Sequence, residues 1–266
     1  MSWLQIVVLA IVQGITEFLP VSSSGHLVLV PAVLGWGDQG LVFDVAVHFG
    51  SLLAVCAYFR DDIAKLVQGG VTLLGGSVNT APSRLALGIA LGTVPAAVAG
   101  LALAGLIEEN LRSPTVIVVT LSGFGILMVI ADRYGRRDKG IAEVRVRDAF
   151  IIGCAQALAL VPGTSRSGVT ITAGRFLGFE RRDAARFSFL LSVPVILLAT
   201  AYETLKLVLG DETVAWVDLA LGIAVSALVA YLTIGFFMRV VGRIGLLPFA
   251  AYRLLLAAII LYLLVW

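Results

Sequence analysis

The chain has 266 residues, 59% of them hydrophobic and only 14% charged, with a formal net charge of +2 at pH 7. Together with a mean hydropathy of +1.02, this composition excludes a soluble globular domain and indicates an integral membrane protein. The two cysteines, Cys56 and Cys154, lie in apolar segments with no Cys or His partner at metal-ligand spacing, so we interpret them as packing residues.

The first apolar region, about 3–35, is interrupted by a polar motif from Gln13 to His26, Gln-Gly-Ile-Thr-Glu-Phe-Leu-Pro-Val-Ser-Ser-Ser-Gly-His. A helix over residues 3–17 would rise only about 22 Å, at about 1.5 Å per residue, which is too short to cross about 30 Å of hydrocarbon. Pro20 stops that helix, and the Ser-Gly run is typical of the N-cap of a second short helix. The region therefore predicts a re-entrant helical hairpin, which enters the membrane and returns to the same side.

Three apolar runs follow, each long enough to cross the membrane as a helix, at about 41–59, 85–107 and 114–131. The next segment, 132–148, is basic, and because Lys and Arg favour cytoplasmic loops it is predicted to be a cytoplasmic linker. We interpret its charge as a topology signal that also contacts lipid headgroups, with no indication of nucleic-acid binding. Its basic residues are Arg133, Arg136, Arg137, Lys139, Arg145 and Arg147.

A second broken apolar region, about 149–178, contains the motif Gln-Ala-Leu-Ala-Leu-Val-Pro-Gly-Thr-Ser-Arg-Ser-Gly-Val-Thr from Gln156 to Thr170. In both motifs the Gly of a Ser-x-Ser-Gly sequence lies 12 residues after the Gln, so the two regions look like copies of each other. The second region is again predicted to be a re-entrant hairpin. Apolar spans at about 184–202, 214–236 and 246–265 complete the chain.

The positions of the basic residues predict an inverted repeat. With the linker in the cytoplasm, 15 of the 19 Lys and Arg side chains fall in cytoplasmic loops, both termini face outward, and the two hairpins enter from opposite sides. The expected fold is an all-α polytopic membrane protein with two inverted halves, 1–131 and 149–266. Each half comprises a re-entrant helical hairpin and three transmembrane helices, and the polar tips of the hairpins are expected to meet near the midplane.

Ionisable side chains at membrane depth are costly and therefore indicate function. Glu17 lies four residues after Gln13, on the same helical face. The second copy has Arg166 at the position of Ser23, and a buried guanidinium, which costs about 2.5–3.5 kcal/mol to insert, needs an anionic partner. The planar fork of Arg matches phosphate, so its combination with Ser, His26 and Glu17 predicts phosphoryl transfer.

Two other interpretations remain open at this point. Glu17 and Arg166 also suit a structural ion pair, and His26 alone suits a packing residue. His48 lies outside the two motifs, and we interpret it as a packing residue, with a position at the site as the alternative. The main functional alternative is a transporter or flippase of phosphate or lipid phosphate, because inverted repeats, broken helices and a midplane anion site also occur in carriers.

The chain resembles the undecaprenyl-diphosphate phosphatases of the bacitracin-resistance type, over essentially its whole length. It meets the first family motif, Glu/Gln-x-x-x-Glu followed by Phe-Leu-Pro-hydrophobic-Ser-Ser-Ser/Thr-Gly-His, and the second, Pro-Gly-x-Ser-Arg-Ser-Gly-x-Thr. Many members have Glu at the position of Gln13, so this position is not an obligatory general base here. The matching residues are Gln13, Glu17, Phe18, Leu19, Pro20, Ser22, Ser23, Ser24, Gly25, His26, Pro162, Gly163, Ser165, Arg166, Ser167, Gly168 and Thr170.

The resemblance implies hydrolysis of the polyisoprenyl diphosphate released by cell-wall polymerisation. It places the protein in the bacterial cytoplasmic (inner) membrane, with an active site that serves the outer (periplasmic) face. It also implies a divalent cation, Mg²⁺ or Ca²⁺, which Glu17 and Gln13 would hold through oxygen ligands. The expected partners are the lipid diphosphate substrate and membrane lipids, and the oligomeric state is left open, with a homodimer among the candidates.

The alignment of Ser23 with Arg166 leads to the hypothesis that Ser23 attacks the terminal phosphorus and that His26, three residues on, handles its proton. Ser22 is the next candidate nucleophile, and direct attack by a metal-bound water is the competing mechanism. Glu17 is expected to be essential as a base or metal ligand. The residues expected to bind the substrate phosphates are Arg166, Ser22, Ser24, Ser165, Ser167 and Thr170.

Overall fold

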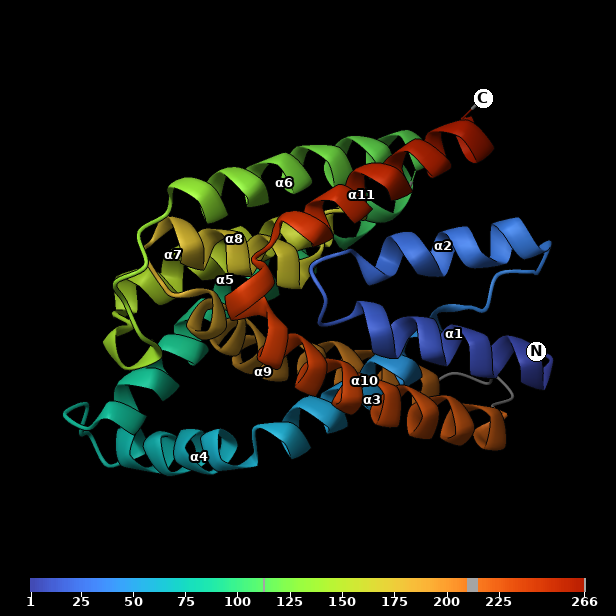
Figure 1. Ribbon diagram of the computed structural model, residues 1–266. Coiled ribbons are helices and arrows are strands. Elements are labelled where there is room, and N and C mark those ends of the chain that lie inside the picture. Colours follow the sequence, from blue (N-terminus) through green and yellow to red (C-terminus); the bar gives the residue numbers. More distant parts are fainter. Residues whose placement is uncertain (112, 210–214, 266) are drawn as a thin grey trace.

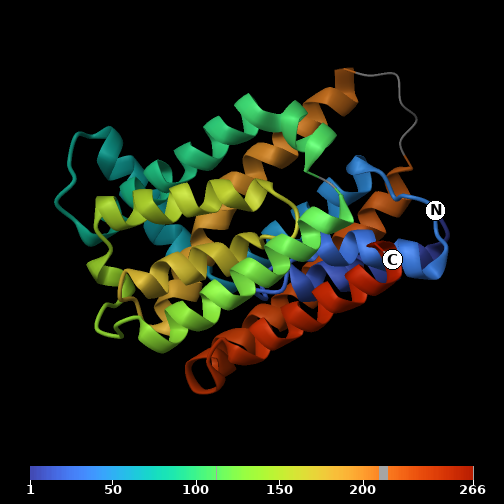
Figure 2. The same cartoon turned by 90° about the horizontal axis from the view of Figure 1, so that it is seen from above.

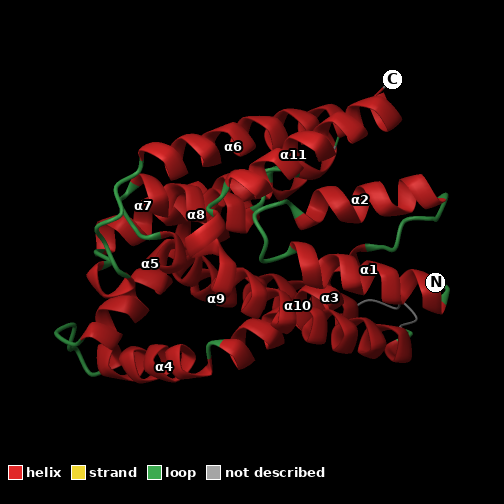
Figure 3. Ribbon diagram, viewed as in Figure 1, coloured by secondary structure: helices red, strands yellow, loops and turns green. Residues whose placement is uncertain are grey.

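The computed structural model describes residues 1–111, 113–209 and 215–265, and over these residues the protein is almost entirely helical (Figure 3). The one β-type contact in this described part is an isolated bridge between Lys139 and Phe179, so the predicted all-α class is confirmed. The helices are α1 (Trp3–Thr16), α2 (Ser23–Leu34), α3 (Leu41–Tyr58), α4 (Arg60–Leu74), α5 (Ala81–Asn110), α6 (Pro114–Tyr134), α7 (Val146–Ala157), α8 (Arg166–Phe176), α9 (Arg181–Leu209), α10 (Trp216–Ile244) and α11 (Leu247–Ile260), with short 3₁₀ turns at Ile141–Glu143 and Leu158–Leu160.

Five helices in the described part of the chain are long and apolar enough to cross a membrane, namely α3, α5, α6, α9 and α10. They confirm a polytopic membrane protein and coincide with five of the six predicted spans. The sixth predicted span, 246–265, is instead the shorter helix α11, continued by a π-helical turn at Leu261–Val265. Helices α1 and α2 have 14 and 12 residues, so the first broken region does contain two short helices.

Helix α4 lies in a segment for which the sequence predicts only a cytoplasmic loop. Asp61 and Asp62 in its first turn favour helix formation, because they face the positive end of the helix dipole. Gly69 lets α4 approach α5 closely, since a Cβ at this position would lie 2.2 Å from the Pro82 carbonyl oxygen. Asp62 also accepts hydrogen bonds from Arg186 of α9. Contacts with distant helices thus hold α4, and a periodicity analysis of the segment alone does not reveal them.

The helices of the two halves are interleaved. Helices α1 and α2 run side by side, joined by a bend that points toward the middle of the molecule, and both chain ends lie at the same end of the molecule (Figure 1). Helices α1 and α3 pack against α10, whereas α7 and α9 pack against α5. Helix α6 lies alongside α11 (Figure 2). Each half therefore buries its helices against the other half, and the core is shared between them.

Small residues bring the short helices close to their neighbours. A Cβ at Gly153 in α7 would lie 2.3 Å from the carbonyl oxygen of Gly92 in α5. A Cβ at Gly14 in α1 would lie 2.8 Å from the Cβ of Val229 in α10. Within membranes, helix association depends on such close backbone approach, because there is little hydrophobic driving force between helices. The two contacts thus fix how deeply α1 and α7 sit in the bundle.

We expect Gly153→Ala to destabilise the fold by about 1–3 kcal/mol, because the added methyl group overpacks the contact between α7 and α5. The change should appear as a lower apparent unfolding temperature of the purified protein in detergent. Gly123→Ala in α6 is the matched control, since no heavy atom lies within 4 Å of a Cβ built there. Equal unfolding temperatures for the two variants would contradict the packing argument.

Candidate active site

The two sequence motifs are in direct contact. Arg166, the first residue of α8, donates through Nη2 to Glu17 Oε1 at 3.0 Å. The hydroxyl of Ser167 donates to the Leu19 carbonyl oxygen at 3.0 Å. These contacts join the end of α1 and the bend after it to the start of α8, which confirms the predicted meeting of the motifs.

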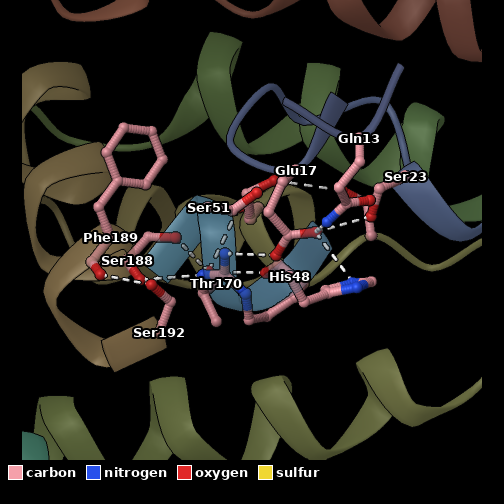
Figure 4. Close-up of polar contacts among 12 residues, drawn as sticks. Gln13, Glu17, Ser23, His48, Ser51, Thr170, Ser188, Phe189 and Ser192 are labelled. Carbon is pink, nitrogen blue, oxygen red and sulfur yellow. Dashed lines mark hydrogen bonds and ion pairs between the residues drawn. The ribbon is translucent and has the colours of Figure 1, made fainter. Parts of the chain in front are cut away.

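Glu17 is the centre of this contact (Figure 4). Its side chain is only 5% exposed, yet it has polar partners on both oxygens. Oε2 accepts hydrogen bonds from Ser23 Oγ at 2.8 Å and from Gln13 Nε2 at 3.0 Å. His48 Nε2 lies 3.4 Å from the same oxygen, and Arg166 occupies the other one. The buried carboxylate is therefore held by an arginine, an amide and a hydroxyl, with the His48 ring beside it.

Arg166 is fixed from three directions. Besides its ion pair with Glu17, its Nη1 donates to the carbonyl oxygen of Ser188 in α9 at 3.2 Å. The guanidinium also lies over the ring of Phe18, 5.7 Å from the ring centroid, at a distance where a cation–π attraction is favourable. Its side chain is 12% exposed, so the group is held in place while part of it remains accessible.

Ser22 and Ser165 have matching and unusual backbone conformations, with φ of 73° and 70°. No other non-glycine residue in the described part of the chain has a positive φ. Such a conformation costs about 1–3 kcal/mol and persists only where the surroundings enforce it. Each serine also lies close to the hydroxyl two residues later, Ser22 to Ser24 at 3.2 Å and Ser165 to Ser167 at 3.3 Å. The two motifs therefore share one local geometry.

A cavity of about 340 Å³ lies between the two motifs and the helices α3 and α9. Its wall combines hydroxyl and charged groups with apolar side chains, which suits a ligand with an anionic head and an apolar chain. The motif residues that line it are Glu17, Ser22, Ser23, Ser24, Ala159, Ser165 and Arg166. Helix α3 adds Leu41, Asp44, Val45 and His48, and α9 adds Val195, Ile196, Ala199 and Thr200.

Ser167 and Thr170, both predicted to bind phosphate, lie behind this wall. Ser167 uses its hydroxyl to bind the first motif. Thr170 donates to the Arg166 carbonyl oxygen at 2.7 Å, and its Oγ1 lies 2.6 Å from Ser188 Oγ in α9. Both side chains are buried, so they support Arg166 from behind and do not face the cavity as expected.

His26 has partners other than Ser23, which corrects the sequence-based hypothesis. Its Nδ1 lies 2.7 Å from the Ser22 carbonyl oxygen and its Nε2 lies 2.6 Å from the hydroxyl oxygen of Tyr252. Because a carbonyl can only accept, Nδ1 carries the hydrogen and Nε2 accepts from the tyrosine. Both nitrogens are thus occupied, whereas Ser23 donates to Glu17. The pattern Ser-x-x-His suggested proximity along a helix but not the direction of the imidazole.

His48 lines the cavity, so its interpretation as a packing residue was wrong. Its Nδ1 donates to the Asp44 carbonyl oxygen at 2.7 Å, and its Nε2 faces Glu17. Asp44 and His48 are four residues apart on α3 and both line the cavity. Two polar residues at this spacing inside an apolar span are the signal that would have identified this face.

The amino-acid sequence relates the chain to known proteins. The family model described as "Bacitracin resistance protein BacA" matches residues 6–259. The chain belongs to this BacA family. Undecaprenyl-diphosphatase 2 of Stutzerimonas stutzeri is 52% identical over 99% of this chain and 98% of its own length. The undecaprenyl-diphosphatases of Teredinibacter turnerae and Hahella chejuensis are each 52% identical over at least 98% of both chains. The resemblance seen in the motifs is thereby confirmed for the whole chain.

The residues of this chain that could hold a hard cation are Glu17 and Gln13. No cluster of three or more His, Cys, Asp or Glu side chains in the described residues suits a metal ion. However, Gln13 Oε1 is buried without a hydrogen-bond partner, and the amide of the same residue contacts Glu17. The Gln13 amide group and the Glu17 carboxylate thus lie together, with the amide nitrogen toward the carboxylate. Mg²⁺ commonly takes one or two protein oxygens and completes its coordination with water and substrate phosphate.

We expect Glu17→Gln to destabilise this BacA protein by about 3–5 kcal/mol, because it leaves the buried Arg166 without a counter-charge. Thermal unfolding in detergent measures the loss, with Glu180→Gln at an exposed position as the control. The double variant Glu17→Gln with Arg166→Gln should recover much of the lost stability, because the unpaired positive charge of Arg166 is then absent. Strictly additive losses in this cycle would show that the two side chains are not coupled.

Proposed function

We propose that this protein is an integral membrane phosphatase that hydrolyses undecaprenyl diphosphate to undecaprenyl phosphate and inorganic phosphate. Recycling of this lipid carrier serves cell-wall synthesis and confers resistance to bacitracin. Membership of the BacA family and 52% identity to proteins named undecaprenyl-diphosphatases support the proposal. The observation that carries it is the hydrogen bond from Ser23 to Glu17, beside Arg166 and at the wall of a cavity.

In the first step, Ser23 is the nucleophile and Glu17 its base. A serine hydroxyl is a weak nucleophile unless a base lies within hydrogen-bond reach, and Glu17 Oε2 lies 2.8 Å from Ser23 Oγ. The Ser23 oxygen forms a bond to the terminal phosphorus while the bond from that phosphorus to the bridging oxygen breaks. Undecaprenyl phosphate leaves with the electron pair and takes the proton from Glu17. In the second step Glu17, now ionised again, takes a proton from a water whose oxygen forms a bond to the phosphorus. The bond from that phosphorus to Ser23 Oγ breaks, the serine oxygen keeps the electron pair and takes the proton from Glu17, and inorganic phosphate leaves.

Arg166 holds the terminal phosphate during both steps. Its planar guanidinium can donate two parallel hydrogen bonds to phosphate oxygens, and the groups that fix it leave part of its side chain at the cavity. Ser22, Ser24 and Ser165 present further hydroxyls to the same cavity. Preorganised donors of this kind stabilise charge that develops in the transition state, which is the main requirement of phosphoryl transfer.

A divalent cation, Mg²⁺ or Ca²⁺, is proposed to bind at Glu17 and Gln13. When bound, it would neutralise charge on the diphosphate oxygens. The unpartnered Gln13 oxygen beside the carboxylate supports this assignment. Gln is sufficient at this position, because its amide oxygen coordinates a cation although it cannot take a proton at neutral pH.

The fold is proposed to be an inverted repeat with two re-entrant hairpins, α1–α2 and α7–α8. The helix contacts between the halves support this repeat. Helix α1 of the first half packs on α10 of the second, and the corresponding helix α7 of the second half packs on α5 of the first. Helix α6 packs on α11. The equal conformations of Ser22 and Ser165 support the repeat at residue level. With α1 and α7 at 14 and 12 residues, neither hairpin arm spans about 30 Å of hydrocarbon.

The site is proposed to open to the outer, periplasmic face of the bacterial cytoplasmic membrane. The basic linker 132–148 covers the last residues of α6 and the first residues of α7. Its charge supports a cytoplasmic location for these two helix ends. The cavity is lined by the first turns of α3 and by the second half of α9, which are the parts of these helices nearer the predicted outer loops. The transporter alternative is not favoured, because the relatives are named as phosphatases.

A covalent phosphoserine is the first testable consequence. We expect a rapid acid quench with terminally ³²P-labelled undecaprenyl diphosphate to trap label on Ser23. Ser23→Ala should lower kcat by at least about a hundredfold, some 2.7 kcal/mol. Ser77→Ala, in the loop after α4, is the control. Failure to trap label, together with more than about a tenth of the wild-type kcat in Ser23→Ala, would favour direct attack by water.

The orientation gives a second consequence. In a variant whose native Cys56 and Cys154 are replaced by Ala, a thiol reagent that cannot cross the membrane should label a cysteine placed at Asp38 in intact cells. It should label a cysteine placed at Lys139 only after permeabilisation. The reverse pattern would place the first hairpin on the cytoplasmic side and would overturn the proposed orientation.

A further inference from the structure

Two neighbouring residues of α11 contact both motifs from behind. The hydroxyl of Tyr252 bonds to His26 Nε2 at 2.6 Å. Arg253 Nη2 donates to the carbonyl oxygens of Gly163 and Thr164, each at 3.0 Å. Helix α11 thus reaches one motif through a tyrosine and the other through an arginine. Neither residue lines the cavity, so neither is placed to touch a substrate there.

The Tyr252 contact determines the position of Ser22. The hydroxyl donates to Nε2 of His26 and so fixes the tautomer in which Nδ1 carries the hydrogen, which binds the Ser22 carbonyl oxygen at 2.7 Å. The two rings are stacked, with an interplanar angle of 1°. Ser22 is the residue with φ of 73° that directly precedes Ser23. The chain of two hydrogen bonds therefore enforces the unfavourable backbone conformation next to the nucleophile.

The Arg253 contact determines the position of the second motif. Arg253 is fully buried, and within the described residues no carboxylate lies at ion-pair distance. Its Nε and Nη2 donate to backbone carbonyls instead, those of Thr120 and Leu121 in α6 as well as those of Gly163 and Thr164, whereas Nη1 is buried without a partner among the described residues. The next residue after Thr164 is Ser165, with φ of 70°. The buried guanidinium of Arg253 thus binds the two carbonyls that come directly before Ser165. Ser165 is the strained residue that precedes Arg166.

Simple packing does not account for this pair. A buried charge without a counter-charge is expensive, and an apolar side chain of similar size is commonly as stable or more stable in its place. The free-energy cost of burying the Arg253 charge is understandable if its guanidinium must hold several carbonyls at fixed positions. Thr120 Oγ1 also donates to the Pro162 carbonyl oxygen at 2.6 Å, so three successive carbonyls of this bend, from Pro162 to Thr164, are bound from α6 and α11.

We infer that Tyr252 and Arg253 are positioning residues, which hold the Ser22–Ser23 and Ser165–Arg166 segments at the separation that one phosphate requires. The inference rests on the proposed phosphatase function. His26 belongs to this arrangement as a structural link between Tyr252 and the first motif, and not as the group that takes the proton of Ser23.

The experiment compares Tyr252→Phe and Arg253→Gln with two controls, Tyr262→Phe and Arg243→Gln, at exposed positions. For each purified variant, phosphate release from undecaprenyl diphosphate gives kcat and KM, and hydrogen–deuterium exchange gives local backbone opening. We expect kcat to fall about tenfold or more in both variants while KM changes less than about threefold, because only the relative placement of reacting groups is lost. Exchange should rise in residues 17–24 for Tyr252→Phe and in residues 161–168 for Arg253→Gln. The controls should behave as wild type.

The local exchange pattern separates the inference from its alternatives. Wild-type kcat and exchange in Tyr252→Phe would overturn it, and so would an equal rise in exchange over the whole protein in both variants. If Arg253→Gln does not fold, Arg253→Lys retains the cation without the planar fork, and its exchange must rise in residues 161–168 for the inference to stand. Absence of phosphate release by the wild type, with the local exchange pattern intact, would refute the proposed function and leave the positioning role.

Discussion

The ion pair between Glu17 and Arg166 is the constraint on which the rest of the structure depends. Each charge comes from a different half of the chain, and each is almost completely buried. Removal of one partner from such a pair is far more damaging than removal of both. Neither motif can therefore be buried stably until the other is in place. The pair couples the assembly of the halves, and the same carboxylate accepts a hydrogen bond from the hydroxyl of Ser23, so correct assembly and the placement of Ser23 depend on one contact.

The layer behind this pair is built mainly from backbone carbonyls bound by side chains. Ser167 binds the Leu19 carbonyl, Thr120 binds that of Pro162, and Arg253 binds those of Gly163 and Thr164. Carbonyls without helical partners are unavoidable where a helix is broken, and inside a membrane no water is available to satisfy them. The polar side chains near the site thus have two tasks, since they solvate the broken backbone and they also set the direction of the helix starts that face the cavity.

The sequence was sufficient for those features that depend on local signals. Run length and composition located five spans, and spacing alone paired the two motifs. The cost of a buried guanidinium suggested Glu17 as the partner of Arg166. What could not be predicted depends on which way a side chain points after distant helices have packed. His26 turns to Tyr252, more than two hundred residues away in the chain, and His48 turns to Glu17 because α3 lies beside the first motif. Helix α4 was missed for the same reason, since Asp62 in its first turn is bound by Arg186, 124 residues away in the chain.

The size of the cavity has a consequence for substrate choice. At about 340 Å³, it lies at the small end of ligand sites, which commonly span about 300–1,000 Å³. A diphosphate and the first part of its hydrocarbon chain fill such a space, and the remainder of a long polyprenol must stay among the lipid tails. Discrimination between long and short prenyl chains then depends on how strongly each chain partitions into the bilayer and not on contacts with the protein. The enzyme would recognise the diphosphate head group, and the bilayer would select for chain length.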